Sequence, residues 1–190
     1  IENALTGLVF AGLANLESAE TVAAGKVAAD YTTDSWSALT AALSMPETTN
    51  GEMVAKTVAI NNALAALVNL TGLRAAINAQ YSDGSARTTL KLAEADYTAG
   101  SWSAYVEAIA AAETVEANAS ATQAAVLDAT AAIGTAKAAL VFAGQADLDA
   151  AKGAAAGKTK ADYTTVSWAV LEEALAMPET TNAEVVSKTG

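Results

Sequence analysis

The sequence predicts an all-α protein of tandem three-helix bundles, joined by long shared or nearly continuous helices into an elongated rod. Alanine supplies 51 of the 190 residues and proline only two, which favours helix along the whole chain. The tripeptide Asp, Tyr, Thr recurs at positions 30, 96 and 162, and a Trp recurs at 36, 102 and 168, so both return every 66 residues. Because alanine side chains fill little space, thin bundles of close helices suit this composition better than one wide core.

The repeats can be placed in order along the chain. Residues 1–9 are interpreted as the end of the last helix of a preceding repeat. Repeat 1 then spans 10–69, repeat 2 spans 70–141, and repeat 3 spans 142–190 and is expected to lack its last helix. Residues 1–58 and 133–190 align without gaps with 34 of 58 positions identical, so repeat 2 is the divergent copy, with an insert near 81–87.

Each Trp is expected to anchor an amphipathic helix. Thr32 can cap the first turn, while Tyr31, just before it, packs on Trp36 four residues into the helix. This pattern is a hydrophobic staple. The same pair recurs as Tyr97 with Trp102 and as Tyr163 with Trp168.

A third helix in each repeat is predicted by capping boxes, in which Ser or Thr is followed three residues later by Glu or Gln. The pairs are Thr49 with Glu52, Ser120 with Gln123, and Thr181 with Glu184. Pro46 and Pro178 lie just before two of them and are expected to end the Trp helix.

The segments between one repeat and the next contain neither Pro nor a polar loop. A shared helix of about 30 to 40 residues, roughly 45 to 60 Å long, is therefore expected to run from each repeat into the next. The alternative is a kink or break at Gly12, Gly72 or Gly144, because each glycine costs about 1 kcal/mol against alanine inside a helix.

Composition excludes several classes of function. The formal charge is −11 with no basic cluster, so neither a nucleic acid nor an anionic membrane surface is expected as a partner. The chain has no Cys and no His, which removes the thiol nucleophile, the imidazole base and most zinc ligation. Charged residues interrupt every apolar stretch well before about 20 residues, so no membrane insertion is expected. The sequence predicts no enzyme, no metal and no cofactor.

The chain resembles the FIVAR family, a small helical module named for being found in various architectures. The resemblance lies in the Tyr, Thr, two residues, Ser, Trp block at 31–36, 97–102 and 163–168, and in the helix entry at Ala121–Val126. Repeat 2 matches best, whereas repeats 1 and 3 have Thr, Thr, Asn at the entry. The resemblance implies a three-helix bundle used in tandem in bacterial cell-wall-associated proteins, extracellular, with ligand binding suspected and no catalytic residues assigned.

Candidate contact residues lie mainly in the insert of repeat 2. Tyr81, Asp83 and Arg87 accompany a turn-like Asp, Gly pair, and Arg74 is the only other arginine. A ligand site there is one interpretation and a plain loop is the other. The recurring Tyr and Trp rings are similarly open to two interpretations, a sugar-stacking platform or the structural staple, and the helix-start spacing favours the staple.

Two functions remain open. The first is a non-catalytic spacer or stalk of a cell-surface, adhesin-like protein, whose partners are the neighbouring repeats and which projects other domains from the cell wall. The second is a module that binds a glycan or an extracellular-matrix protein, mainly through repeat 2.

Overall fold

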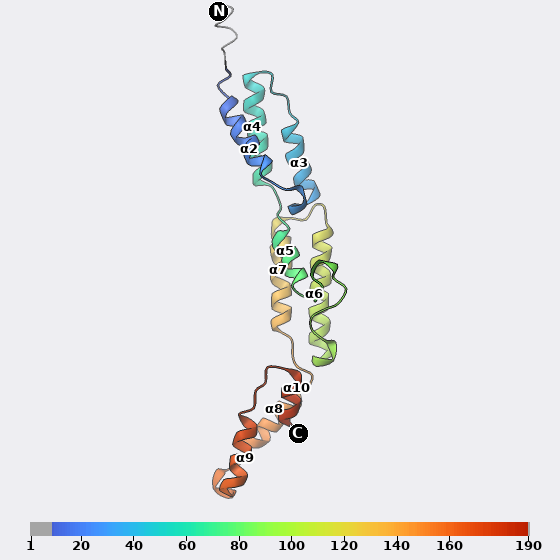
Figure 1. Cartoon of the computed structure of the whole chain (residues 1–190), viewed down its shortest axis with the longest axis vertical. Coiled ribbons are helices and arrows are strands. Elements are labelled where there is room, and N and C mark those ends of the chain that lie inside the picture. Colours follow the sequence, from blue (N-terminus) through green and yellow to red (C-terminus); the bar gives the residue numbers. More distant parts are fainter. Residues whose placement is uncertain (1–8, 190) are drawn as a thin grey trace, which may run out of the picture. The chain divides into compact units, whose positions relative to one another are not determined.

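The computed structural model describes residues 9–189, and within that range the regular structure is helical, with no strand, as the sequence predicts. Each repeat supplies three α-helices, and a 3-10 turn lies just before each Trp helix; repeat 2 has a second such turn at Gly84–Ala86 (Figure 1). Repeat 1 contains α2 (Leu13–Ala24), α3 (Thr33–Leu43) and α4 (Asn50–Ala65); repeat 2 contains α5 (Thr71–Asn78), α6 (Ala99–Ala117) and α7 (Gln123–Ala138); repeat 3 contains α8 (Gln145–Ala156), α9 (Thr165–Leu175) and α10 (Asn182–Thr189).

The chain divides into two compact units whose borders cut through repeat 2. One unit holds the chain up to Ile77 together with Ala111–Thr130. The other holds Asn78–Ala110 together with the chain from Ala131 onward. Repeat 1 therefore lies wholly in the first unit and repeat 3 wholly in the second, and each unit is described by itself.

Repeat 1 packs α2 and α3 against α4, and the three helices lie side by side in Figure 1. Leu16, Leu39 and Ile60 supply one large side chain from each helix, and none is more than 2 % exposed. Small residues fill the positions between them, which lets the helices approach closely. These small core residues are Ala19, Ala23, Ala42 and Ala63.

The third helices of repeats 1 and 3 begin at capping boxes. In repeat 1 the Thr49 hydroxyl accepts the N–H of Glu52 at 3.2 Å, and the Glu52 carboxylate accepts the N–H of Thr49 at 2.9 Å. The Thr48 hydroxyl also donates to this carboxylate and is the main cause of the lowered pKa of Glu52. Thr181 and Glu184 repeat the arrangement at α10.

The third predicted box does not form. The residue that caps α7 is Thr122, whose hydroxyl accepts the N–H of Ala125 at 3.2 Å. Ser120 instead donates to the carboxylate of Asp34, and the side-chain oxygen of Gln123 accepts the N–H of Asn69 at 3.1 Å. Both predicted capping residues therefore bond to repeat 1.

The predicted continuous helices between repeats are absent. The alternative of a break is correct at Gly144, whereas the other break lies at 66–70 and Gly72 is inside α5. Helix α4 ends at Ala65 and α5 begins at Thr71, while α7 ends at Ala138 and α8 begins at Gln145. The backbone between these helices bonds to the Asp, Tyr, Thr tripeptide, described below, and so leaves the helical conformation. Shared helices therefore no longer support the predicted rod.

Gly12 and Gly144, which directly precede α2 and α8, allow close packing. Gly144 precedes α8 directly, and a Cβ there would lie 2.9 Å from the Val186 side chain of α10. Its N–H donates to the side-chain oxygen of Asn182 at 3.0 Å. Gly12 donates to Asn50 in the same way in repeat 1, at 2.8 Å. The glycine thus brings the start of the first helix against the start of the third.

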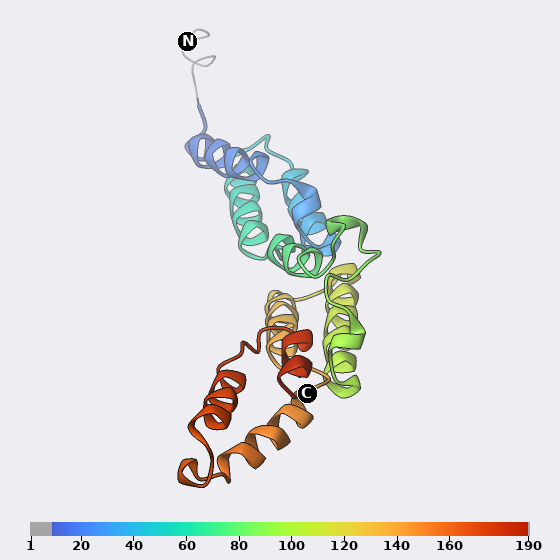
Figure 2. The same cartoon turned by 60° about the horizontal axis from the view of Figure 1, so that its bottom comes forward.

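Repeat 3 has the beginning of a third helix, contrary to the expectation that it lacks its last helix. Helix α10 covers Asn182–Thr189, which aligns with Asn50–Thr57, the first half of α4. Figure 2 shows α8 and α10 of this repeat next to each other. The predicted helix end at 1–9 lies outside the described residues except for Val9, which is not helical.

Candidate functional site

The recurring Tyr and Trp rings contact each other in every repeat. Their ring centroids lie 6.1 Å apart in repeat 1, 6.0 Å in repeat 2 and 6.0 Å in repeat 3. In repeats 1 and 2 the rings are stacked, with interplanar angles of 14° and 11°. Because each ring covers a face of the other, little of that face is left for a sugar. The pairs are Tyr31 with Trp36, Tyr97 with Trp102, and Tyr163 with Trp168.

A pair of hydroxyl groups lies beside each ring pair. In repeat 1 the Thr32 hydroxyl donates to the Ser35 hydroxyl at 2.8 Å, and the Ser35 hydroxyl donates to the Thr32 carbonyl at 3.0 Å. Thr32 therefore makes no side-chain cap to the backbone of α3, whereas Thr164 does so at the matching helix of repeat 3. The expected cap is thus wrong for Thr32 and correct for Thr164, although both hydroxyls bond to the serine three residues on.

These hydroxyls hold the connector that leaves the third helix, a role that sequence reasoning missed. Ser35 accepts the N–H of Val68 at 3.2 Å, and the Val68 carbonyl accepts the N–H of Thr32 at 3.0 Å. The N–H of Leu70 donates to the Asp30 carbonyl at 2.8 Å, which completes an isolated antiparallel bridge between Tyr31 and Asn69.

Repeat 2 holds its own connector with the same bonds. Ser101 accepts the N–H of Val141 at 3.2 Å, and the Val141 carbonyl accepts the N–H of Thr98 at 2.8 Å. Phe142 pairs with Tyr97 in the bridge, and their rings lie 5.5 Å apart. We call the residues from Asp to Ser in each repeat the clamp, namely 30–35, 96–101 and 162–167. The signal for the clamp was the recurring Ser, which a ring staple alone does not require, whereas the recurring Asp contributes its backbone carbonyl.

Polar contacts join repeat 1 to repeat 2 within the first unit. Arg74 of α5 donates to Glu116 at 2.8 Å and to the carbonyl of Ala29. The N–H of Asp34 donates to the Ala119 carbonyl at 3.2 Å. These bonds, with those of Ser120 and Gln123, form what we call the junction. Arg74, a candidate ligand contact, is used here in a contact between repeats.

The other three candidate contact residues share one loop in the second unit. Residues 79–93 turn back on themselves, with an isolated bridge between Tyr81 and Leu90. The Asp83 carboxylate accepts the Thr88 hydroxyl and the Thr88 N–H, which lower its pKa. Arg87 adopts a left-handed backbone with φ of 53° and donates to Asn78 at 2.8 Å. The loop is thus held by its own polar groups, and the role of these residues in binding stays a prediction.

A buried glutamine lies under this loop. Gln80 is 6 % exposed, and its side-chain oxygen accepts the hydroxyl of Tyr105 at 3.1 Å and the ammonium of Lys137 at 3.2 Å. Burial is the main cause that raises the pKa of Tyr105. This network fixes the base of the loop to α6 and α7.

Charged groups elsewhere form ion pairs. Lys56 is 5 % exposed and binds both Glu20 at 2.8 Å and Glu47 at 2.5 Å, contacts that raise its pKa. Between residues 9 and 189 no group of three or more His, Cys, Asp or Glu is placed to hold a metal ion. In the same range no helix has the length and apolar character needed to cross a bilayer.

An open groove lies between α8 and α9 in repeat 3. Its volume is about 340 Å³, and its walls are mainly alanine and aromatic side chains. Tyr163 is 45 % exposed at its edge, and Thr164 of the clamp is exposed, whereas the matching Thr32 is 2 % exposed. The residues that line the groove include Ala151, Ala155, Tyr163, Ser167, Trp168 and Leu171.

Comparison with known proteins supports the resemblance noted in the sequence. Residues 71–141 match the model of the FIVAR domain, a range that coincides with repeat 2. FIVAR is a non-catalytic domain of varied surface proteins. Searches of curated proteins and of solved structures gave no match.

Proposed function

Because residues 71–141 match the FIVAR domain model, we propose that this chain is a non-catalytic spacer of an extracellular, cell-surface protein that projects other domains from the cell wall. The family match is consistent with a structural module of a surface protein. The spacer role, the adhesin-like context and the location outside the cell are the proposal.

The observation that supports the proposal is the junction between repeats 1 and 2. A spacer can hold other domains away from the cell wall only if its consecutive repeats are fixed to each other, because a free linker lets the repeats reorient. Here the connector is bonded to the clamp at Val68 and Leu70, and Thr71 begins the next helix at once. Arg74 and Asp34 add side-chain and backbone bonds across the junction.

A second candidate function is binding of a glycan or a matrix protein through repeat 2. The loop 79–93 favours it, since no counterpart occurs in repeats 1 and 3 and it carries an arginine in a left-handed conformation. A glycan array and an immobilised matrix-protein panel would test this function, with Tyr81→Ala as the variant that should lose any binding. Reproducible, Tyr81-dependent binding would favour this function over the spacer alone.

Single-molecule energy transfer tests the spacer directly. The sequence has no cysteine, so Ser18→Cys in α2 and Ala124→Cys in α7 give two unique labelling sites in the first unit. A held junction gives one narrow distribution of dye separation. The double variant Asp34→Ala with Arg74→Ala should broaden it, whereas Thr40→Ala on the exposed side of α3 should leave it unchanged. A broad distribution in the unmodified chain would contradict the proposal.

A further inference from the structure

A cluster of three charged side chains occupies the same place in repeats 1 and 3, and we call it the ion cluster. It joins the first helix of the repeat, the loop before the third helix, and the third helix itself. The aligned pairs at the offset of 132 are Glu20 with Lys152, Glu47 with Glu179, and Lys56 with Lys188. The first-helix residue thus changes from an acid to a base, while the other two residues are the same.

In repeat 1 two carboxylates bind one ammonium group. The Lys56 Nζ atom lies 2.8 Å from a carboxylate oxygen of Glu20 and 2.5 Å from one of Glu47. Lys56 is buried, whereas both glutamates reach the surface. A buried charge needs a counter-ion, and Lys56 has two. Neutralisation of one glutamate therefore leaves Lys56 paired with the other.

In repeat 3 the charges are reversed, and one carboxylate binds two ammonium groups. The Glu179 carboxylate accepts Lys152 at 2.6 Å on one oxygen and Lys188 at 2.6 Å on the other. The Lys188 side chain is buried, and it also donates to the carbonyls of Leu175 and Met177. Neutralisation of Glu179 leaves both ammonium groups of this cluster without their shared counter-ion.

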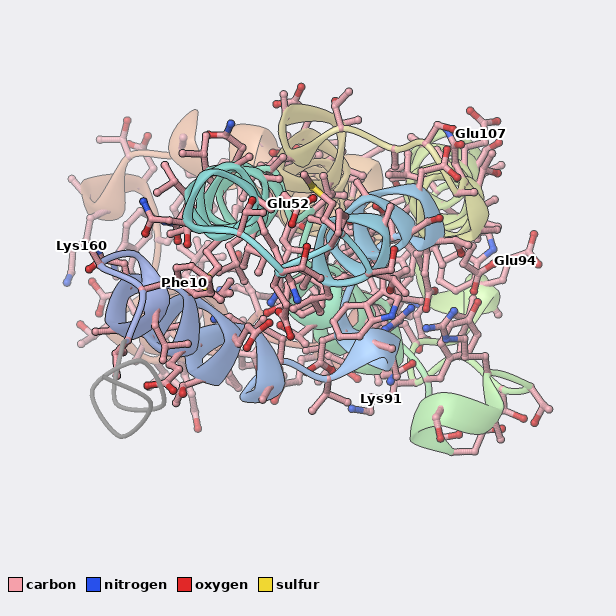
Figure 3. All side chains as sticks on the ribbon, turned by 90° about the horizontal axis from the view of Figure 1, so that it is seen from above. Phe10, Glu52, Lys91, Glu94, Glu107 and Lys160 are labelled. Atoms are coloured by element: carbon pink, nitrogen blue, oxygen red, sulfur yellow. The ribbon has the colours of Figure 1, made fainter. Side chains whose placement is uncertain are left out.

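The other charged side chains on the packed helices lie in solvent or are bonded outside the ion clusters. Those of repeat 1 are Glu17 in solvent, Asp34 bonded to Ser120, and Glu52 in the cap of α4. Those of repeat 3 are Asp147, Asp149 and Glu173 in solvent, Glu172 bonded to Lys160, and Glu184 in the cap of α10. Glu52 and Lys160 are labelled in Figure 3. The two caps match, so the ion clusters are where the charges of the two repeats differ in sign.

The ion that is alone in its cluster determines the direction of the pH dependence. The two lysines lower the pKa of Glu179, so these contacts stabilise repeat 3 above the usual pKa of 4.5 and are lost as the pH falls through the lowered pKa. The two glutamates raise the pKa of Lys56, so its contacts stabilise repeat 1 below the usual pKa of 10.5 and are lost as the pH rises through the raised pKa.

We propose that the ion clusters are opposite pH switches, through which acid releases the third helix of repeat 3 and alkali releases the third helix of repeat 1. When Glu179 takes up a proton, Lys152 and the buried Lys188 repel each other with no anion between them. When acid protonates one glutamate of repeat 1, the second still holds Lys56. One repeat therefore opens while the other stays folded, a property that is independent of the spacer role.

Fluorine NMR of the chain labelled with 5-fluorotryptophan tests the proposal, because each repeat has one tryptophan. The signals of Trp36 and Trp168 give the folded-to-unfolded ratio of repeats 1 and 3 in urea near the midpoint of each. Between pH 7 and about pH 3.5, the ratio for repeat 3 should fall by about threefold or more beyond any fall in repeat 1. Between pH 7 and about pH 11.5, the ratio for repeat 1 should fall further than that for repeat 3.

Exchange of the first-helix residues should exchange the behaviour of the repeats. Lys152→Glu gives repeat 3 a second carboxylate, so its response to acid should shrink to that of repeat 1. Glu20→Lys, or the milder Glu20→Gln, leaves Glu47 as the one carboxylate in repeat 1, whose ratio should then fall by about threefold or more in acid. Lys158→Glu and Glu17→Lys make the same changes of charge at exposed positions and should leave the responses unchanged.

Three results would overturn the proposal. The first is an equal response of repeats 1 and 3 to acid in the unmodified chain. The second is an acid response of repeat 3 that survives Lys152→Glu. The third is an effect of the two exposed control variants as large as that of the cluster variants. If Glu20→Lys prevents repeat 1 from folding, Glu20→Gln decides, since it adds no charge to the cluster.

Discussion

Ser35 shows how much a single hydroxyl does in this repeat. It accepts bonds from Thr32 and from the N–H of Val68, and it donates to the Thr32 carbonyl. Ser101 makes matching bonds in repeat 2. The residue therefore joins the start of the Trp helix to the connector, which a short, small side chain can do at this close approach.

Replacing this serine should loosen the connector. Ser35→Ala leaves the buried Thr32 hydroxyl and the Val68 N–H without this partner, at a cost of about 1 to 3 kcal/mol. Hydrogen exchange of the Val68 and Leu70 amides should accelerate, and urea unfolding should shift to lower concentration. Ser167→Ala, in the exposed clamp of repeat 3, should cost less. Equal effects at the two serines would contradict the role assigned to the connector.

The three tryptophans should differ in their contribution to stability. Trp102 is 9 % exposed, so Trp102→Ala should cost about 3 to 5 kcal/mol by leaving a cavity. Trp36 and Trp168 are half-buried, and Trp168 borders the open groove, so its replacement should cost least. Unfolding of the three variants, followed by the remaining tryptophans, gives the order. A larger loss at Trp168 than at Trp102 would contradict it.

The sequence predicted which aromatic residues meet but not what the clamp holds. Tyr31 and Trp36 are five residues apart across a helix start, and the local geometry of that start brings their rings together. The bonds to Val68 connect residues 33 apart in the sequence, and they use backbone atoms that every residue has. No residue type in the connector marks such a partner.

Helix starts in this chain depend on a few side chains. At α4 and α10, the box residues that the sequence predicts are the residues that cap the helix. At α7 the same pattern failed because Ser120 and Gln123 found partners in repeat 1, and Thr122 was free to cap. The capping-box pattern thus predicts the cap correctly where the Ser or Thr and the Glu or Gln side chains have no competing partner in another repeat.

The capping carboxylates should make the helices sensitive to acid. The pKa of Glu52 and of Glu184 is lowered, first by the hydroxyls of Thr48 and Thr180, so both groups stabilise the folded chain above their usual pKa of 4.5. This contribution is lost as the pH falls through the lowered folded-state pKa. The double variant Glu52→Gln with Glu184→Gln keeps a capping amide, so stability should change little at pH 7 but fall less steeply below pH 4.5. Urea unfolding from pH 7 to pH 3 measures this, and an unchanged slope would contradict it.

At the scale of the whole molecule, the spacer proposal predicts extension. A single globule of 190 residues would have a radius of gyration of about 16 Å. A chain whose repeats follow one another as a spacer should exceed this value in small-angle scattering. Measurement at low concentration separates the extension of one copy from association between copies. A radius near that of the globule would rule the spacer out.

The helical fold followed from the sequence, whereas continuous helices were expected between repeats and breaks were only the alternative. An unbroken apolar stretch without proline predicts continuous helix, yet the chain leaves the α-helix at 66–70 and 139–144. The clamp offers these backbone groups partners that the helix would otherwise supply. The connector backbone can bond either within a helix or to the clamp. The clamp residues lie far away in the sequence, so a local helical pattern gives no sign of them.

The bonds between clamp and connector use backbone atoms on the connector side, and this bears on how such arrays evolve. Asn69 occupies the bridge in one connector and Phe142 in the other, with the same backbone pairing. A connector can therefore accumulate substitutions without losing its place. Unequal recombination that duplicates, deletes or reorders whole repeats would keep the backbone bonds between clamp and connector, whereas the side-chain bonds of the junction would have to be acquired again.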